Sequence, residues 1–314
     1  MSAPNSQLAR GEGPADGLVV ADKPQGWTSH QVVGRVRRLL GTRKVGHAGT
    51  LDPMATGVLL VGVGRATRLL GHLAGHDKTY TATIRLGIST VTDDAEGEPV
   101  EWRGAAGVTA PDVHAALPSL TGVISQVPSS VSAIKVAGKR AYALVRAGEE
   151  VELKARQVTV TRFEVTGARS GTAPGPDGAV AEVPVLDVDV VVDCSTGTYI
   201  RALARDLGAA LGSGGHLTAL RRTRVGAFDL SLVALDAAGL AADGRPRLLP
   251  LAEVARRAFP VLEVDAAQAT DIGYGRSLEL ELPADPTALL HEGNLLALYQ
   301  PAGPGRARPV AVLA

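Results

Sequence analysis

The first part of the chain with a regular hydrophobic pattern combines a strand with a helix. From Gly17, the segment LVVADKP is apolar and stops at Pro24, which predicts a short strand entering a turn. Thr28 or Ser29 can cap the next element, and Gly41 follows its last apolar position. The positions between them repeat with the period of one helix face, so the pattern predicts a helix that ends at Gly41. That face is formed by Val32, Val33, Val36, Leu39 and Leu40.

The rest of the chain mixes strand and helix patterns without a regular βαβ order. Strand-like alternation is found in TYTATIRLGI, QVTVTRFEVTG and VPVLDVDVVVDCS, and helical spacing in TYIRALARDLGAAL and from Pro111 to Leu117. Residues 167–182 contain four Gly and two Pro, so we expect an exposed loop there. Short strand signals return in residues 259–314. The pattern therefore predicts an α+β protein with a small β-rich unit at its C-terminal end.

Composition narrows the class of protein. The 314 residues are 45% hydrophobic and 20% charged, which is typical of a soluble globular chain with a sizeable core. Lys plus Arg and Asp plus Glu number 32 each, so a nucleic-acid partner would have to meet a local basic patch. The single cysteine, Cys194, excludes an intrachain disulfide framework and a Cys-based zinc site.

The same features indicate a compartment. A lone cysteine fits a reducing cytoplasm. The sequence has no apolar run of about 18 residues, so we expect no membrane span. Residues 1–16 lack the apolar centre of a signal peptide, and we expect them to be a disordered lead-in.

One glycine-rich segment, GHAGTLDPMATG at residues 46–57, has the composition of a functional loop. Its Asp-Pro step biases Asp52 toward an extended backbone, which can present a carboxylate from a rigid turn. The same step also initiates ordinary turns, so spacing alone leaves both interpretations open. The glycine spacing does not fit a phosphate or dinucleotide loop, and His47 has no third metal ligand nearby. We therefore expect neither a bound phosphate or dinucleotide at this loop nor a metal, and His47 is either structural or stacks on a ring.

Charge is unevenly distributed along the chain. Residues 27–76 contain seven basic side chains and one acid, Asp52. A second basic group lies in residues 201–224, and we expect the acid-rich turn from Asp93 to Glu101 to restore neutrality elsewhere. A carboxylate among cations suits nucleophilic or base chemistry on an anionic substrate. Tyr199 and Arg201 stand at the start of a helix, where they are equally well a buried hydroxyl and a surface charge.

Six motifs follow one another in a fixed order: DKPQGWTS, GHAGTLDPMATGVLLVGVGRATRL, KTYTATIRLGISTVTDDAEG, SAIKVAGKRAYALVRAGEEVELKARQVTV, CSTGTYIRALARDLG and HLTALRRTRVGAF. Over residues 17–228 the chain thereby resembles the TruB family of tRNA pseudouridine synthases. The resemblance implies a catalytic domain in residues 17–250, with a mixed, largely antiparallel sheet flanked by helices and loops. It also implies a thumb-like insertion near residues 128–156 and a PUA-like RNA-binding domain in residues 259–314.

The resemblance implies isomerisation of uridine 55 in the T-loop of tRNA to pseudouridine, without a cofactor. Asp52 matches the family's catalytic aspartate, and we expect Arg201 to pair with it. Whether the carboxylate attacks the ring or the sugar, or assists a glycal-type route, stays open. Tyr80 is expected to stack on the flipped uracil and to touch the proton that C5 loses.

Other family positions are expected to contact the substrate. His47 fills the gap that the flipped base leaves, Tyr199 and Leu220 line the uracil pocket, and Lys23 shapes its floor. A further set of basic residues is expected to contact phosphates, which gives affinity and salt dependence but no sequence specificity. These are Arg35, Arg37, Arg38, Arg43, Lys44, Arg221 and Arg222.

The expected partner is the T-arm stem-loop of tRNA, bound by a monomer that needs no protein partner and no membrane. Two alternatives share the motifs. One is a tRNA-folding chaperone that acts by binding alone, and the other is the catalytic subunit of a guide-RNA particle. The intact motif around Asp52 argues against binding as the only role.

Overall fold

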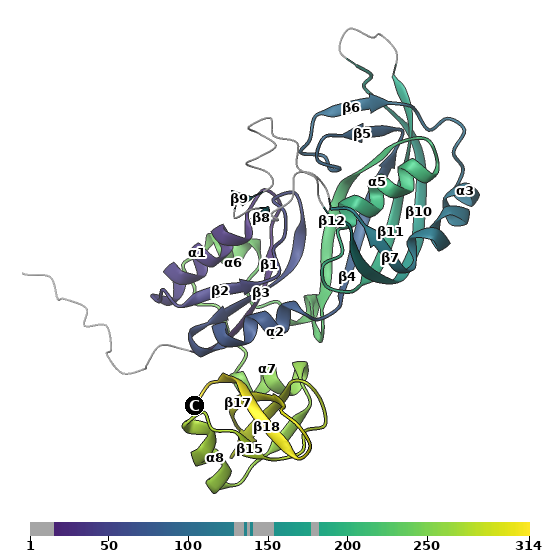
Figure 1. The fold of residues 1–314 in the computed structure, drawn as a ribbon. Helices are drawn as coiled ribbons and strands as arrows, with labels where there is room; N and C mark the ends of the chain where they lie inside the picture. Colours follow the sequence, from purple (N-terminus) through teal and green to yellow (C-terminus); the bar gives the residue numbers. More distant parts are fainter. Residues whose placement is uncertain (1–15, 129–134, 137–138, 141–153, 177–181) are drawn as a thin grey trace, which may run out of the picture.

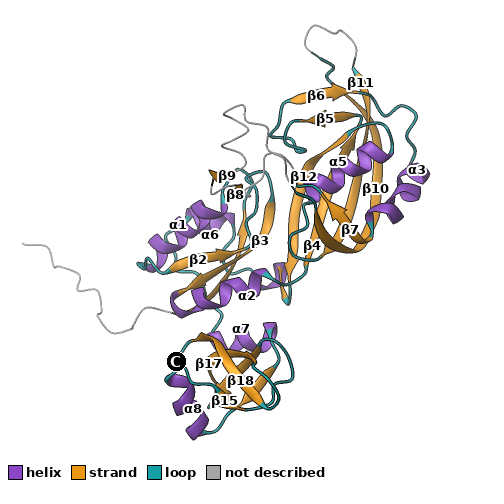
Figure 2. Cartoon of the chain, viewed as in Figure 1, coloured by secondary structure: helices purple, strands orange, loops and turns teal. Residues whose placement is uncertain are grey.

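The structure, a computed structural model, describes residues 16–128, 135–136, 139–140, 154–176 and 182–314. In this part of the chain a nine-stranded sheet and a separate five-stranded sheet form the framework, with helices packed against both (Figures 1 and 2). The large sheet contains β1 (Gly17–Lys23), β2 (Val45–Ala48), β3 (Thr56–Val63), β4 (Lys78–Leu86), β7 (Gly122–Gln126), β10 (Arg156–Ala173), β11 (Val183–Cys194), β12 (Gly215–Val225) and β13 (Phe228–Asp229).

The first helix, α1 (Ser29–Leu40), begins and ends where its sequence predicts. The Thr28 hydroxyl accepts from the Gln31 N–H at 3.2 Å, and the Gln31 side chain accepts from the Thr28 N–H at 2.7 Å. This reciprocal pair satisfies two of the free N–H groups at the helix start. Gly41 ends the helix with a left-handed φ of 62°. The local signals therefore sufficed to define this element.

The large sheet is mixed and largely antiparallel, as the resemblance implies. Its strands follow the order β1-β3-β12-β4-β11-β10-β7, with β2 beside β3 and β13 beside β12. The pairing of β3 with β12 is parallel and short, and it joins the two halves of the sheet. Gly57 makes this junction possible, because a Cβ there would lie 2.1 Å from the carbonyl oxygen of Arg222.

The prediction of an exposed loop at residues 167–182 is largely wrong. Strand β10 continues to Ala173, and its partner β11 begins at Val183, so the two form a long hairpin. Strand β11 alternates between buried and partly exposed side chains, and along the edge opposite β4 its backbone N–H and C=O groups need partners. Backbone pairing with it outweighs the glycine content of the opposite segment. Residues 177–181 lie outside the described part.

The remaining elements lie on the faces of the two sheets or beside them. Helix α5 (Ile200–Ala210) covers one face of the large sheet, with Leu203 and Leu207 fully buried against its strands (Figure 1). The remaining described elements before residue 251 are η1 (Gly64–Leu69), α2 (Leu70–Ala74), β5 (Ile88–Thr90), β6 (Pro99–Trp102), α3 (Ala110–Ala116), η2 (Leu117–Leu120), β8 (Lys135–Val136), β9 (Lys139–Arg140), η3 (Leu230–Leu232) and α6 (Ala237–Ala241).

The small β-rich unit expected at the C-terminal end is present as a five-stranded sheet of order β14-β16-β17-β18-β15. It packs on the part of the chain that forms the large sheet through one apolar cluster that includes Leu73, Phe259 and Leu298. Arg65 adds a hydrogen bond of 2.6 Å to the carbonyl of Leu313. Its elements are α7 (Leu251–Ala258), β14 (Val261–Glu263), α8 (Ala266–Gly273), β15 (Leu278–Glu279), β16 (Thr287–His291), β17 (Asn294–Pro301) and β18 (Arg306–Val312).

Two segments named from the sequence fall mainly outside the described residues. Residues 1–15 of the expected lead-in lie outside the described part. Asp16 is described, and its side chain accepts a hydrogen bond of 2.6 Å from the backbone N–H of Arg65. Most of the expected insertion at residues 128–156 lies outside the described part as well. Within the described ranges, no helix is both long and apolar enough to cross a membrane.

Candidate active site

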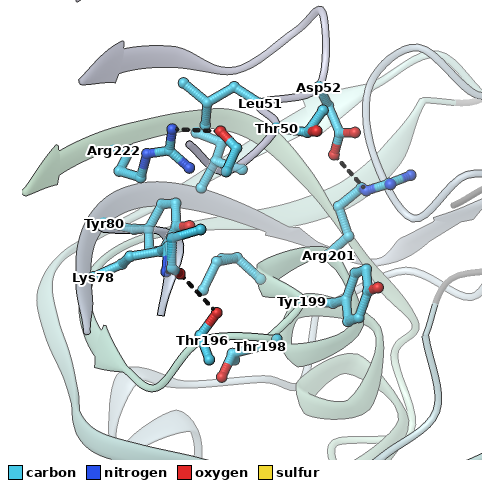
Figure 3. A pocket seen from close by; sticks show the side chains of 15 residues that line it. Thr50, Leu51, Asp52, Lys78, Tyr80, Thr196, Thr198, Tyr199, Arg201 and Arg222 are labelled. Atoms are coloured by element: carbon cyan, nitrogen blue, oxygen red, sulfur yellow. Dashed lines mark hydrogen bonds and ion pairs between the residues drawn. The ribbon is translucent and has the colours of Figure 1, made fainter. Parts of the chain in front are cut away.

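A cavity of about 330 Å³ opens on the face of the large sheet that α5 covers. Distant parts of the chain meet there: the loop before β3, the end of α2, the start of β4, the start of α5 with the loop before it, and β12 (Figure 3). These segments are far apart in sequence, so the sheet order brings them together. The residues that argue for chemistry in this cavity are Asp52, Lys78, Tyr80, Tyr199, Arg201, Leu220 and Arg222.

Asp52 stands in the loop between β2 and β3, which is fixed on both sides of it. The Ser29 hydroxyl accepts from the Leu51 N–H at 2.9 Å and donates to the Leu51 carbonyl at 3.2 Å. On the other side, the Pro53 carbonyl accepts from Lys23 Nζ at 3.1 Å and from the Gly26 N–H at 2.8 Å. The loop thus presents the Asp52 carboxylate to the cavity from a rigid turn.

Arg201, near the start of α5, holds two carboxylates at once. Its Nε lies 3.1 Å from Oδ2 of Asp52, and its Nη1 lies 3.3 Å from Oδ2 of Asp94. The pair expected from the sequence, Arg201 with Asp52, is therefore present (Figure 3). Asp94 and Arg201 are buried, whereas the Asp52 side chain keeps 36% of its surface exposed. The exposed carboxylate is the one that faces the cavity.

The position of Asp94 corrects one expectation. The acid-rich turn after β5 does not restore neutrality elsewhere but lies beside the site. The backbone N–H of Glu96 donates to Asp94 Oδ1 at 3.0 Å, and the Thr92 hydroxyl donates to the same atom. Burial, together with Asp94 and Asp52, raises the pKa of Glu96. The turn is thus part of the electrostatic surroundings of Asp52.

Tyr80 projects from β4 into the same cavity and is buried. Burial raises the pKa of its phenol, while the charge of Arg222 and a hydrogen bond from its side chain act to lower it. Lys78, two residues earlier on the same strand face, is also buried and donates to the carbonyls of Ala74 at 2.9 Å and His76 at 2.7 Å. Burial lowers the pKa of Lys78 to about 8.

Tyr199 and Leu220 both line the cavity, as the resemblance implies. The backbone of Tyr199 is fixed by Gln126, whose side chain accepts from its N–H at 2.7 Å and donates to its carbonyl at 3.0 Å. Burial raises the pKa of the Tyr199 phenol. The cavity therefore offers two phenol rings and several aliphatic side chains, Leu220 among them, which suits a flat base.

Lys23 and His47 stand outside the cavity lining. Lys23 is fully buried and donates to the carbonyls of Pro24, Trp27 and Pro53, so it supports the Asp52 loop from behind. Burial lowers the pKa of Lys23 to about 8. His47, on β2, meets the His30 ring edge-on with 5.3 Å between ring centres. Burial, and then His30 and Arg222, lower its pKa.

The basic residues expected at phosphates fall into distinct groups. Arg38, Arg43 and Lys44 are exposed around the end of α1. Arg37 is exposed too, and its guanidinium donates to the Val45 carbonyl at 2.8 Å. These residues keep surface that an RNA backbone can reach.

The other three are engaged within the protein. Arg35 donates to the carbonyls of Leu240 at 2.7 Å and Ala242 at 2.6 Å at the end of α6. Arg221 pairs with Asp22 at 2.7 Å on the sheet face opposite the cavity. Arg222 is 1% exposed and belongs to the cavity itself. These placements argue against the phosphate contacts expected for them.

Sequence reasoning missed three residues of this site: Lys78, Asp94 and Gln126. A signal was present for Lys78, because alternate residues of a strand share a face and Lys78 is two positions before Tyr80. Asp94 and Gln126 reach the site only through the packing of distant segments, and no local pattern indicates them.

Comparison with known proteins gives the family. The model of the TruB family pseudouridylate synthase N-terminal domain matches residues 37–200. That of the tRNA pseudouridylate synthase B C-terminal domain matches residues 201–242, and that of the tRNA pseudouridine synthase II C-terminal domain matches residues 259–314.

Individual proteins agree with the family models. The chain is 57% identical over 301 residues to tRNA pseudouridine synthase B of Cutibacterium acnes, covering 95% of this chain and 98% of that one. It is also 57% identical over 302 residues to the same-named protein of Thermobifida fusca, covering 96% and 99%. A chain in the crystal structure of a Cbf5-Nop10-Gar1 complex shares the fold, with a TM-score of 0.66, 24% identity, and coverage of 90% and 78%. The chain therefore belongs to the TruB family of pseudouridylate synthases and is an isomerase.

Proposed function

We propose that this protein converts uridine 55 in the T-loop of tRNA to pseudouridine. The observation that carries the proposal is the Asp52 carboxylate, which is fixed in a rigid loop, paired with Arg201 at 3.1 Å and open to a cavity that Tyr80 also lines. The relatives named tRNA pseudouridine synthase B support tRNA as the substrate. The T-loop and uridine 55 follow from the six motifs and await the test below.

The proposed reaction balances within one nucleotide. The bond between C1′ and N1 breaks, a bond between C1′ and C5 forms, C5 loses a proton and N1 gains one. Asp52 supplies the carboxylate that assists glycosidic exchange, and Arg201 keeps that carboxylate oriented. Tyr80 stacks on the uracil ring while it turns, and its hydroxyl contacts the proton that C5 loses.

The uridine must leave its stack to reach Asp52, because the cavity lies within the protein and a T-loop base is buried in folded tRNA. Such extrusion costs a few kcal/mol, which contacts to the flipped base offset. Tyr80, Tyr199 and Leu220 provide these contacts in the cavity. His47, which lies outside the cavity lining and beside His30, occupies the gap in the loop in this proposal.

Exposed cations near the end of α1 supply affinity for the RNA backbone. Arg38, Arg43 and Lys44 project from one short segment of this protein, and phosphate contacts of this kind give a steep dependence of binding on salt. T-loop shape supplies most of the recognition. This division predicts that salt weakens binding without changing which uridine is modified.

The test is tritium release from [5-³H]uridine-labelled tRNA transcript by wild type and Asp52→Asn. We expect release by wild type alone, at least about 10³-fold faster than by the variant, because removal of a reacting group rarely costs less. Binding of tRNA should stay within about one order of magnitude, since one carboxylate among cations contributes little favourable binding. A transcript with cytidine at position 55 should release no more tritium than the blank.

Two outcomes would overturn the proposal in different ways. Equal release by Asp52→Asn would remove the catalytic assignment. Tight binding without release by either protein would favour a chaperone that acts by binding. Release from a bare T-arm stem-loop, with no guide RNA added, would exclude the guide-dependent alternative.

A further inference from the structure

His30 and His47 are two histidines whose rings touch near the loop that carries Asp52. His30 is an exposed side chain in the first turn of α1, and His47 is a half-buried side chain on β2. Their ring centres lie 5.3 Å apart and their planes meet at 81°, which is an edge-to-face contact. Aromatic pairs prefer this geometry, and it favours one ring orientation over others by about two- to tenfold. The contact can therefore bias how the His47 ring is oriented.

No hydrogen bond at its buried nitrogen orients the His47 ring. Its Nδ1 atom has no hydrogen-bond partner among the residues that the structure describes. Burial, and then His30 and Arg222, lower the pKa of His47, so its ring is neutral near pH 7. A neutral ring is suited to stacking between bases. Packing thus sets the orientation of this ring on the Nδ1 side, and His30 supplies a ring against which it packs.

The first turn of α1 reaches the same loop at a second point. Ser29, the residue before His30, accepts from the Leu51 N–H at 2.9 Å and donates to the Leu51 carbonyl at 3.2 Å. Leu51 directly precedes Asp52. The reciprocal cap at the helix start fixes this turn. One rigid turn therefore contacts both His47 and the residue beside Asp52, which links the position of the imidazole ring to that of the carboxylate.

We propose that His30 is a positioning residue for base flipping, which holds the His47 ring in the orientation in which it fills the gap left by the flipped uridine. The proposal rests on the proposed role of His47. A ring that is oriented in advance fills the gap without the cost of ordering it at that moment. The uridine then spends more time beside Asp52, which raises the rate of the reaction more than the affinity for tRNA.

A double-mutant cycle measures whether His30 acts through His47. Single-turnover tritium release from [5-³H]uridine-labelled tRNA is measured at saturating enzyme for wild type, His30→Ala, His47→Ala and the double variant. We expect His30→Ala alone to slow release about three- to tenfold, which is the bias that an edge-to-face contact supplies. In the His47→Ala background the same change should cost less than about 1.5-fold, because the ring that it orients is absent. The Kd for tRNA should change less than about twofold when His30 is replaced.

His30→Phe and His30→Leu separate the effect of a ring from that of bulk. Phenylalanine keeps a flat ring, so release should stay within about twofold of wild type. Leucine has no ring, so it should be as slow as His30→Ala. Leucine favours a helix more than phenylalanine does, so rescue by phenylalanine alone cannot come from general support of α1. Because His30 is exposed, none of these changes opens a cavity in the core.

His72→Ala is the matched control. The His72 ring also meets an aromatic ring edge-on, that of Phe259, with 6.4 Å between ring centres and 84° between planes. It belongs to α2 and does not line the cavity. The substitution therefore removes the same kind of contact from another place in the protein. We expect tritium release to stay within about twofold of wild type.

Two results would overturn the role of His30. One is a cycle in which the losses from His30→Ala and His47→Ala multiply, and the other is a leucine variant as fast as the phenylalanine variant. A His47→Ala variant as fast as wild type would also remove the role, because there would be no ring to position. In all three cases an active wild type with an inactive Asp52→Asn leaves the proposed function intact. An inactive wild type would overturn the proposed function, and the role of His30 with it.

Discussion

The two faces of the central strands differ in how their charged side chains are paired. On the face away from the cavity, acids of β11 pair with arginines of β4 and β12. Asp187 binds Arg85 of β4 through two bonds of 2.7 Å, and Asp193 lies 3.6 Å from Arg224 of β12. On the cavity face, Lys78 donates to two backbone carbonyls and has no such partner among the ion pairs of the described residues.

This difference shows what each face is for. Pairs on the exposed face cancel charge locally and contribute about 1 kcal/mol or less each. On the cavity face, neutral carbonyls satisfy the donors of Lys78 and Arg222 but leave their charge in place. Arg201 alone among these cavity cations meets carboxylates, Asp52 and Asp94. The cavity face therefore holds two cations, Lys78 and Arg222, that no carboxylate of the described residues pairs with, and local positive charge of this kind suits a polyanionic substrate.

The largest effect is expected from Arg201→Met, which removes the cation that two carboxylates share. Asp94 would be left buried without its partner, which typically costs about 3–5 kcal/mol of unfolding free energy. Asp52 would lose its orientation, so tritium release should fall by at least about 10³-fold. Urea unfolding and single-turnover release measure the two effects separately.

Arg205→Met is the control on the same helix. Arg205 pairs with Asp93 at 3.3 Å and Asp206 at 2.9 Å, and its side chain is 32% exposed. We expect it to lose about 1 kcal/mol or less and to keep its activity within about threefold. Equal losses of stability and activity in the two variants would mean that every ion pair of α5 matters to the same extent. Arg201 would then have no special role in the cavity.

The same contrast explains what the sequence could predict. Helix α1 was predictable because the Thr28 cap and Gly41 act within a few residues of the chain. The two cavity tyrosines, Arg201 and Leu220 came from motif resemblance, and the sheet order assembles them. Nothing local places Asp94 beside Asp52, because a turn 42 residues further along the chain is positioned only by tertiary packing.

Arg221 and Arg222 of β12 show that the sequence held a signal that the interpretation did not use. Arg221 and Arg222 are adjacent in a strand, so they must point to opposite faces. One pairs with Asp22 on the exposed face, and the other is buried in the cavity. The sequence-based expectation gave both the same role as phosphate contacts because it treated a charge run as one surface. Backbone pairing similarly decided the hairpin at residues 167–173, where composition predicted a loop.

A smaller effect is expected on the pH dependence of the unfolding free energy, and it tests the contrast between the two faces. Burial lowers the pKa of Lys78 from 10.5 to about 8, so the unfolded chain binds more protons between these values and stability rises with pH there. Lys78→Met removes this proton uptake. We expect its unfolding free energy to rise less steeply than that of wild type from pH 8 to pH 10, by about 1.4 kcal/mol per pH unit.

Both proteins should carry Cys194→Ala, because burial raises the pKa of that thiol to about 11 and Lys78 acts on it. Lys23, whose pKa is also about 8, stays in both and contributes equally. Urea unfolding at half-unit pH intervals gives the two slopes. Parallel slopes would show that Lys78 is solvated in the folded protein, and the contrast between the faces would then rest on Arg222 alone.

The smallest effect is expected on the exposed face, where Asp187→Asn breaks the bidentate pair with Arg85. The two side chains are 21% and 30% exposed, so the loss should be about 1 kcal/mol or less of unfolding free energy. The loss should shrink further when NaCl is raised from 0.1 M to 1 M, because the Debye length falls to about 3 Å. Tritium release should stay within about twofold of wild type. A tenfold loss of activity would show that charge on this face also acts on the cavity, because the variant changes charge without removing a core side chain.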